Sequence, residues 1–355
     1  MEIYFAPMQG VTGWPFRMTH LRHYDGVDRY YMPFISVHQS RAMKGGEKRD
    51  MDPAHNVPGR MVPQLLPGRA EDSLAYMEML ADAGYDEVSL NFGCPARTVT
   101  TKHKGAGILA EPSVLDAYLE HLFTGMTDRL SNMKVTVKTR VGMDDRGQID
   151  ELIRIYNRYP MAQVQVHARL GKDAYDGTPD LDAFRRFYEG ITHPLCYNGD
   201  IRSSEDLRNL QEAFPELKAV MIGRGMIADP MLAEKLKAHP QGGGTPDEAR
   251  MPESGNQVKA HPQGGGAPEH TENVSGTCGE KERLIRFHDD LCDAWYADYG
   301  NEYPTICRMM EIWDYLERSF PGSARLVRKI RKARKLDVYM DLARQILAMD
   351  YCPST

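Results

Sequence analysis

Eight short runs of β-forming residues recur between residues 3 and 223, and most are followed by a loop and then a stretch of helical period. Because parallel strands need such crossover connections, the alternation predicts a parallel α/β fold. Eight repeats favour a closed (β/α)8 barrel, or TIM barrel. A doubly wound open sheet is the alternative, but no Gly-x-Gly-x-x-Gly turn follows the first run. The expected strands are 3–6, 30–34, 61–65, 87–91, 135–139, 163–167, 195–198 and 219–223, with helices such as 73–83 and 113–123 between them.

The 355 residues fit a barrel of about 250 residues plus a smaller domain. We expect a barrel domain at 1–236, a disordered Gly/Pro-rich linker at 237–279 and a small all-α domain at 280–355. Within the linker the sequence Lys-Ala-His-Pro-Gln-Gly-Gly-Gly occurs twice, at 237–244 and 259–266, which is too little to build a repeat fold. Its two histidines, His239 and His261, could in principle hold a metal, but a flexible setting disfavours this.

The composition is that of a soluble protein, with 41% hydrophobic and 26% charged residues. No apolar run approaches the roughly 20 residues that span a bilayer, and the first residues do not resemble a secretory signal. The six cysteines include no Cys-x-x-Cys pair of the kind that binds zinc. We therefore expect a cytoplasmic monomer without a membrane or metal partner. The net charge of -6 leaves room for a local basic surface.

Polar side chains finish nearly every expected strand. In an eight-stranded α/β barrel the loops that leave the carboxyl ends of the strands ring one open face, where reactive residues lie. Any one of these side chains could be an ordinary rim residue, but their shared position predicts an active site. They are Gln9, Gln64, Asn91, Cys94, Lys138, Arg140, His167, Arg169, Asn198, Asp200 and Arg224.

Six of these strand ends resemble, in the same order, the motifs of the tRNA-dihydrouridine synthases. The segments are Ala-Pro-Met-Gln-Gly-Val-Thr from Ala6, Asn-Phe-Gly-Cys-Pro from Asn91, Val-Lys-Thr-Arg-Val-Gly from Val137, Val-His-Ala-Arg from Val166, Asn-Gly-Asp-Ile from Asn198 and Met-Ile-Gly-Arg-Gly from Met221. The resemblance covers residues 3 to about 236, and that family also has a helical domain. It implies reduction of specific uridines in tRNA to 5,6-dihydrouridine, with FMN as cofactor and NADPH or NADH as electron donor. Gln9 and Gly13 replace the family's usual Ala and Asp, and Ala168 its usual Gly.

The resemblance also implies which residues hold the flavin. Lys138 would stabilise the negative charge of the reduced ring, although a rim salt bridge is the alternative. His167 would contact the ring, unless it is simply a packed barrel histidine. The full set comprises Pro7, Met8 and Gln9 against the ring, Gln64 at its pyrimidine edge, Lys138 and His167, and a phosphate site made by Asn198, Gly199, Asp200, Gly223 and Arg224.

Cys94 is the expected catalytic acid. Hydride transfer from flavin N5 to C6 of uracil leaves C5 in need of a proton. A thiol, with an ordinary pKa of about 8.5, is mostly protonated at neutral pH and could supply it. An inert buried cysteine is the alternative. Asn91 and Arg169 would bind the substrate, and the following loop, 96–107, is expected to be mobile.

A uridine in folded RNA must be extruded to reach such a site, so the enzyme needs RNA contacts. The predicted basic helix, which contains Arg328, Lys329 and Lys332 within residues 325–335, is suited to bind phosphates. A merely solvated helix face is the alternative. Trp295, Tyr299 and Trp313 are interpreted as core aromatics rather than as stacking platforms for bases. The competing functions are a flavin barrel oxidoreductase that acts on a free pyrimidine, and an RNA-binding module whose flavin site has decayed.

Overall fold

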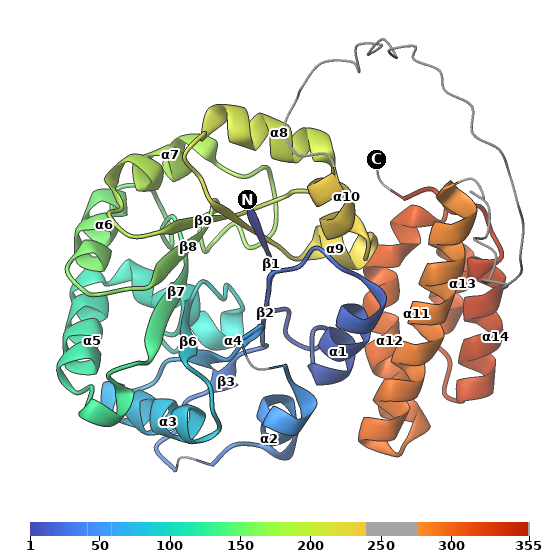
Figure 1. Cartoon of the computed structure of the whole chain (residues 1–355), viewed down its shortest axis with the longest axis horizontal. Coiled ribbons are helices and arrows are strands. Elements are labelled where there is room, and N and C mark those ends of the chain that lie inside the picture. The colour runs from blue at the N-terminus through green and yellow to red at the C-terminus, as the bar shows by residue number, and fades with distance from the viewer. Residues whose placement is uncertain (41, 58, 239–275, 354–355) are drawn as a thin grey trace, which may run out of the picture.

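Ten parallel strands form a single sheet in the computed structural model, which describes residues 1–40, 42–57, 59–238 and 276–353 (Figure 1). The order of the strands is β3-β5-β6-β7-β8-β9-β10-β1-β2-β4. Each predicted run overlaps at least one of them, so the parallel α/β prediction is confirmed. The strands are β1 Glu2–Phe5, β2 Arg29–Tyr31, β3 Ile35–Ser36, β4 Met61–Val62, β5 Gln64–Leu66, β6 Glu87–Phe92, β7 Lys134–Arg140, β8 Gln163–His167, β9 Leu195–Asn198 and β10 Ala219–Ile222.

The two ends of this strand order are joined through Pro63. β2 pairs with β4 and β3 pairs with β5, while β4 and β5 are two parts of one extended segment that only Pro63 interrupts. Proline has no amide hydrogen to donate, but its carbonyl still accepts from the amide of Ser89 at 2.9 Å. The ten short strands therefore act as eight, and the predicted closed barrel is confirmed.

Alternate side chains of each strand point into and out of the barrel. Along β1, Ile3 and Phe5 join the large core beneath the helices, whereas Tyr4 belongs to a second, inner cluster with Tyr31 and Cys196. Polar groups in the barrel interior are bonded to one another: the amide of Gln165 donates to the Tyr31 hydroxyl at 2.7 Å. This packing fills the lower part of the barrel and leaves the carboxyl ends of the strands for a cavity.

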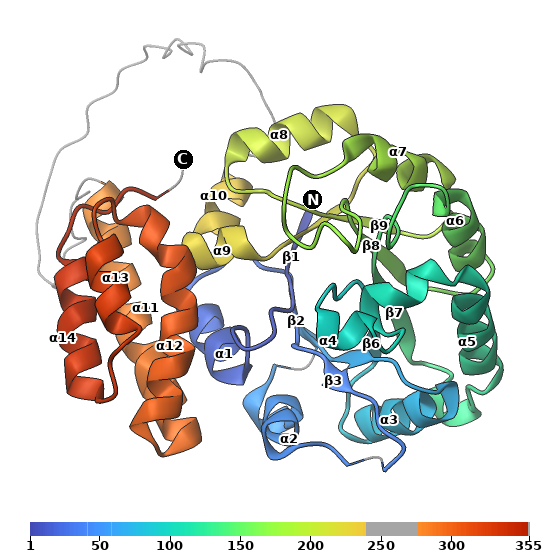
Figure 2. The same ribbon diagram turned by 180° about the vertical axis from the view of Figure 1, so that it is seen from behind.

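Helices surround the outside of the barrel (Figures 1 and 2). The two example helices expected at 73–83 and 113–123 are present as α3 and α5. The helices up to residue 238 are α1 Trp14–His23, α2 Gly45–Met51, α3 Ala70–Asp82, α4 Arg97–Thr100, α5 Pro112–Thr124, α6 Ile149–Asn157, α7 Leu181–Gly190, α8 Ser204–Ala213, α9 Arg224–Ala228 and α10 Leu232–Ala238.

The last part of the chain forms a helical bundle that packs beside α1 and α9 (Figure 1). Its helices are α11 Gly276–Tyr299, α12 Glu302–Leu316, α13 Ala324–Ile330 and α14 Leu336–Leu347. Trp295 and Trp313 are buried in it, as predicted, whereas Tyr299 is only half-buried. Arg283 of α11 makes two hydrogen bonds to the carboxylate of Glu234 on α10, at 2.8 and 2.6 Å, and thereby ties the bundle to the barrel.

The predicted boundaries of the linker differ from the observed helices. Helix α10 continues to Ala238 and α11 begins at Gly276, so helices extend into both ends of the 237–279 segment. Residues 239–275, with His239, His261 and most of the repeated octapeptide, lie outside the described residues. Among the residues that the structure describes, no helix is long and apolar enough to cross a membrane, and no three His, Cys, Asp or Glu side chains cluster as a metal site would require.

The predicted basic helix at 325–335 is shorter than expected. Helix α13 ends at Ile330, and Lys332 lies in the turn before α14. Ile330 and Ala333 are both buried, so the chain turns here to pack α14 back on the bundle, and packing outweighs local helix propensity. Arg328, Lys329 and Lys332 are nevertheless exposed.

A buried hydrogen-bonded group in the bundle gives a stability prediction. The Tyr339 hydroxyl accepts from the indole of Trp313 at 2.9 Å and lies 2.7 Å from Nε2 of His288. Tyr339→Phe removes the partner of both groups, so we expect the free energy of unfolding to fall by about 1–3 kcal/mol in urea titrations. Tyr303→Phe, at a residue that is 47% exposed, is the matched control. Equal stability of the two variants would contradict the prediction.

Candidate active site

A cavity opens at the carboxyl ends of the strands and encloses about 830 Å³, counting the part open to solvent. Residues at the ends of seven of the eight barrel strands contribute to the wall of the cavity. The cavity therefore forms only because the barrel is closed. The lining residues are Ala6, Pro7, Met8, Gln9, Phe34, Asn91, Gly93, Cys94, Lys138, Arg140, His167, Tyr175, Asn198, Gly199, Asp200, Ile201, Arg202, Gly223, Arg224 and Gly225.

Cys94 lies on a turn that the side chain of Asn91 holds. The amide oxygen of Asn91 accepts from the backbone amides of Gly93 at 3.1 Å and Cys94 at 2.9 Å. Its amide nitrogen donates to Gln64 at 2.7 Å. Gln64 is fully buried and is not part of the cavity lining. The side-chain amides of Asn91 and Gln64 thus support the turn that carries Cys94.

Gly105 allows the next loop to pack against this turn. The amide of Ala106 donates to the carbonyl of Cys94 at 2.9 Å. Gly105 has a φ of +55°, and a Cβ there would lie 2.7 Å from the same carbonyl oxygen. Glycine meets both demands because it lacks that atom. Residues 105–109 are buried, while the mobility expected for this loop stays a prediction.

The Cys94 thiol is half-buried in the cavity wall. Burial raises its pKa above the ordinary value, and the nearby positive charge of Lys138 only partly opposes this effect. Deprotonation would place a negative charge in a partly buried position, where less water is available to stabilise it. The thiol therefore keeps its proton at neutral pH, as a general acid requires.

Lys138 projects from β7 toward the cavity and donates to the side-chain oxygen of Asn198 at 2.8 Å. The Asn198 amide nitrogen in turn donates to the carbonyl of Met221 at 2.7 Å, which fixes its orientation. Burial, and then the charge of Arg140, lower the pKa of Lys138 to about 8. Lys138 is thus a cation below that pH, held by an amide rather than a carboxylate, so its charge is available to a ligand.

Asp200 joins three arginines at the far side of the cavity. Its carboxylate accepts from Arg169 at 2.8 Å, from Arg224 at 2.5 Å and from Arg202 at 3.4 Å. Burial by itself would raise the pKa of Asp200, but these hydrogen bonds and charges outweigh it and lower the pKa. Asp200 consequently stays ionised and orients the guanidinium groups.

Arg169 is buried behind the lining instead of pointing into the cavity. It donates to the carbonyls of Asp176 at 3.1 Å and Gly177 at 2.6 Å, which hold the loop after β8. It also lies 3.2 Å from Nε2 of His167, which must accept because arginine can only donate. Burial and the surrounding positive charges keep the pKa of His167 well below its usual range.

Arg140 and Tyr175 are among the lining residues to which no particular role was assigned from the sequence. Arg140 is buried and donates to the carbonyls of Gly93 at 2.8 Å and Leu170 at 2.7 Å. Tyr175, 54% exposed, lies with its ring centroid 5.6 Å from Arg140 and 5.2 Å from Arg224. Arg140 was already named among the polar strand ends, and it follows Lys138 by two residues on the same strand face. Tyr175 lies in a loop without a motif.

The structure brings together most of the predicted site residues. Gln64 and Arg169 lie behind the cavity wall, and the three basic residues of the bundle, Arg328, Lys329 and Lys332, are not part of it. The predicted residues that line the cavity are Pro7, Met8, Gln9, Asn91, Cys94, Lys138, His167, Asn198, Gly199, Asp200, Gly223 and Arg224.

Comparison with known proteins identifies relatives of the chain. The sequence model of the dihydrouridine synthase (Dus) family matches residues 4–264. The chain is 30% identical over 347 residues to the tRNA-dihydrouridine(16) synthase of Neisseria meningitidis serogroup B, covering 95% of this chain and 92% of that protein. It is 26% identical over 239 residues to the tRNA-dihydrouridine synthase B of Pasteurella multocida, covering 67% and 69% of the two chains.

Among solved structures, histamine dehydrogenase from Rhizobium sp. 4-9 resembles the chain with a TM-score of 0.50 and 12% identity. The match covers 67% of this chain and 45% of that one. At this identity the likeness concerns the fold alone.

The raised pKa of Cys94 predicts how its reactivity depends on pH. Because the thiolate is the nucleophile, alkylation of Cys94 by iodoacetamide should be slower at pH 7 than that of free cysteine and should increase as the pH rises above the ordinary thiol range. Mass spectrometry of the Cys94 peptide measures the rate, with the Cys94→Ser variant as a blank. Labelling at pH 7 faster than that of free cysteine would mean that the pKa is lowered instead.

Proposed function

The chain belongs to the dihydrouridine synthase family, and from that premise we propose that it reduces uridine 16 of tRNA to 5,6-dihydrouridine with FMN as its bound cofactor. The two Neisseria relatives named for position 16 match 95% of this chain, the helical bundle included. The observation that carries the proposal is the presence of Cys94 and Lys138, an acid and a cation, in the wall of one cavity.

The cavity wall fits a flavin phosphate. A Cβ at Gly199 would lie 2.2 Å from the Tyr197 hydroxyl and would clash with it, and a Cβ at Gly223 would fit tightly, 3.3 Å from Met8. Bare backbone of this kind lets amide groups approach a phosphate, and Arg224 adds a charged donor. Asp200, as an anion, would orient Arg224 rather than bind the phosphate itself. The proposed cofactor residues are Pro7, Met8, Gln9, Lys138, His167, Asn198, Gly199, Gly223 and Arg224, with Gln64, Arg169 and Asp200 supporting them.

The residues of this chain would then handle the charge of the reaction. When bound, reduced FMN supplies the hydride that C6 of uracil receives, and NADPH or NADH is the proposed source of electrons. Lys138, positively charged below about pH 8, would stabilise negative charge in the cavity. Asn198 keeps its ammonium group in place.

Cys94 would give its proton to C5 of the same ring. Its raised pKa keeps the proton on sulfur until the developing negative charge at C5 makes transfer favourable. Because Cys94 is only partly buried and lines a cavity open to solvent, water can return a proton to the resulting thiolate. Asn91 uses both ends of its amide to hold the turn, and we therefore propose that it positions Cys94 rather than binding uracil.

The proposed acid is tested by Cys94→Ala. This variant should keep its FMN absorbance but lose nearly all formation of dihydrouridine at position 16, by a factor of at least about 100, because proton transfer by a positioned group contributes about that much. Single-turnover reduction of unmodified tRNA, with mapping of the product position, gives the measurement. Cys352→Ala, at an exposed cysteine, is the control. Near-normal turnover by Cys94→Ala would refute the proposed role.

We further propose that Arg328, Lys329 and Lys332 contact RNA phosphates. Changing all three to Ala should weaken tRNA binding and reduce the slope of log affinity against log salt concentration by up to about 3, one for each lost contact. The control changes three exposed basic residues near the amino ends of the strands, Arg129, Lys134 and Lys218. If both triple variants keep wild-type affinity at low salt, this part of the bundle is only a solvated surface.

A further inference from the structure

A second cleft adjoins the candidate active site, and Gln9 and Phe34 line both. It lies between the loop that precedes α1, helix α2, the last turns of α11 and the middle of α12. It encloses about 910 Å³, counting the part open to solvent. Its lining residues are Gln9, Gly10, Gly13, Trp14, Pro33, Phe34, Ile35, Lys44, Gly46, Glu47, Arg49, Asp50, Trp295, Asp298, Tyr299 and Arg308.

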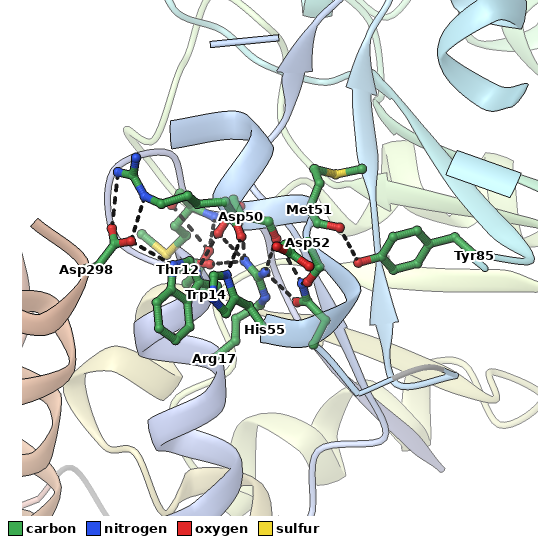
Figure 3. Close-up of polar contacts among 12 residues, drawn as sticks. Thr12, Trp14, Arg17, Asp50, Met51, Asp52, His55, Tyr85 and Asp298 are labelled. Atoms are coloured by element: carbon green, nitrogen blue, oxygen red, sulfur yellow. Dashed lines mark hydrogen bonds and ion pairs between the residues drawn. The ribbon is translucent and has the colours of Figure 1, made fainter. Parts of the chain in front are cut away.

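Two aromatic rings in this cleft are held in fixed orientations. Trp14 stacks on His55 with the ring centroids 4.1 Å apart, and its indole nitrogen donates to Asp298 at 3.2 Å (Figure 3). Tyr299 stacks on the buried Trp295 at 5.5 Å with an angle of only 8° between the rings. Trp14 and Tyr299 are each only half-buried. Arg49 lies over the Tyr299 ring, 5.9 Å from its centroid, so Trp14 offers the main rigid aromatic surface to the cleft.

Most of the charges around the cleft are already paired. Asp298 accepts from Arg49 at 2.7 Å, and Asp50 accepts from Arg17 at 3.1 Å (Figure 3). Arg308 lies 3.1 Å from Glu311 and also donates to the carbonyl of Gly10 at 2.9 Å. A phosphate would have to compete with these carboxylates for the arginines. A flat, uncharged ring with hydrogen-bonding edges could bind in the cleft without competing for these arginines.

We propose that this cleft binds the base of the nucleotide next to the target uridine in the same RNA strand. The inference rests on the proposed function, because an RNA that inserts one base into the active site must place the adjoining nucleotide close to its mouth. Unstacked RNA bases are commonly bound by stacking on aromatic side chains and by polar contacts to their edges. The shared wall at Gln9 and Phe34 places the two sites next to each other.

The test combines a protein variant with an altered RNA, using the FMN-bound full chain. Trp14→Leu removes the aromatic surface but keeps an apolar side chain. Titrations would measure the affinity for three RNAs: intact tRNA, tRNA that lacks the base before the target uridine, and tRNA that lacks the base after it. The target is the uridine that the wild-type protein reduces, or uridine 16 if the protein reduces none. At one of these positions, base removal should weaken wild-type binding roughly 5- to 150-fold, the range found for base stacking on aromatic residues.

The same base removal should weaken tRNA binding by the Trp14→Leu protein about twofold or less, because the indole ring on which the base would stack is already absent. Tyr296→Leu, at an exposed aromatic residue of α11 outside the cleft, should respond as the wild type does. Tyr299→Leu takes the place of Trp14→Leu if that variant fails to fold. Equal costs of base removal in wild type and variant, at both positions, overturn the proposal. Because binding is measured, a protein that binds tRNA but makes no dihydrouridine refutes the proposed function separately.

Discussion

The pairing of β1 with β10 is the contact on which the site depends. These strands come from opposite ends of the barrel domain, and their register sets Phe5 opposite Ile222. Ala6 and Met8 are thereby brought beside Gly223, although more than two hundred residues separate them in sequence. Without this closure the cavity would lack a wall, and the basic residues after β9 and β10 would not face Cys94 and Lys138.

Within the closed barrel, the charged groups of the cavity are balanced by short hydrogen-bonded connections. Asp200 gathers three arginines, while Lys138 is held by an uncharged amide. A lysine paired with a carboxylate would already have its charge neutralised. The amide partner of Lys138 leaves that charge available to a bound group. One side of the cavity thus has a cation free to respond to a ligand, and the other has arginines in fixed positions.

Much of this arrangement could be predicted from the sequence, since strand periodicity and polar strand ends are local signals. The eight strands, the position of Cys94 and the lysine on β7 follow from such signals and from the motif resemblance. Gln64, Asn91 and Arg169 were expected to touch ligands. In the structure Gln64 and Arg169 lie behind the cavity wall, and Asn91 lines the cavity and also holds the turn at Cys94. Which way a side chain at a strand end turns depends on partners distant in sequence, such as Gln64 for Asn91. The early end of helix α13 likewise depends on the burial of Ala333.

The contact between Arg308 and the carbonyl of Gly10 joins the helical bundle to the loop that carries Pro7, Met8 and Gln9. A backbone carbonyl cannot be changed by substitution, so only the donor on α12 is free to vary during evolution. Any exchange of the bundle between relatives would have to bring a donor of similar reach, or the loop beside the active site would lose its support. The two parts of the chain are therefore expected to evolve as one inherited unit, even though a long segment separates them.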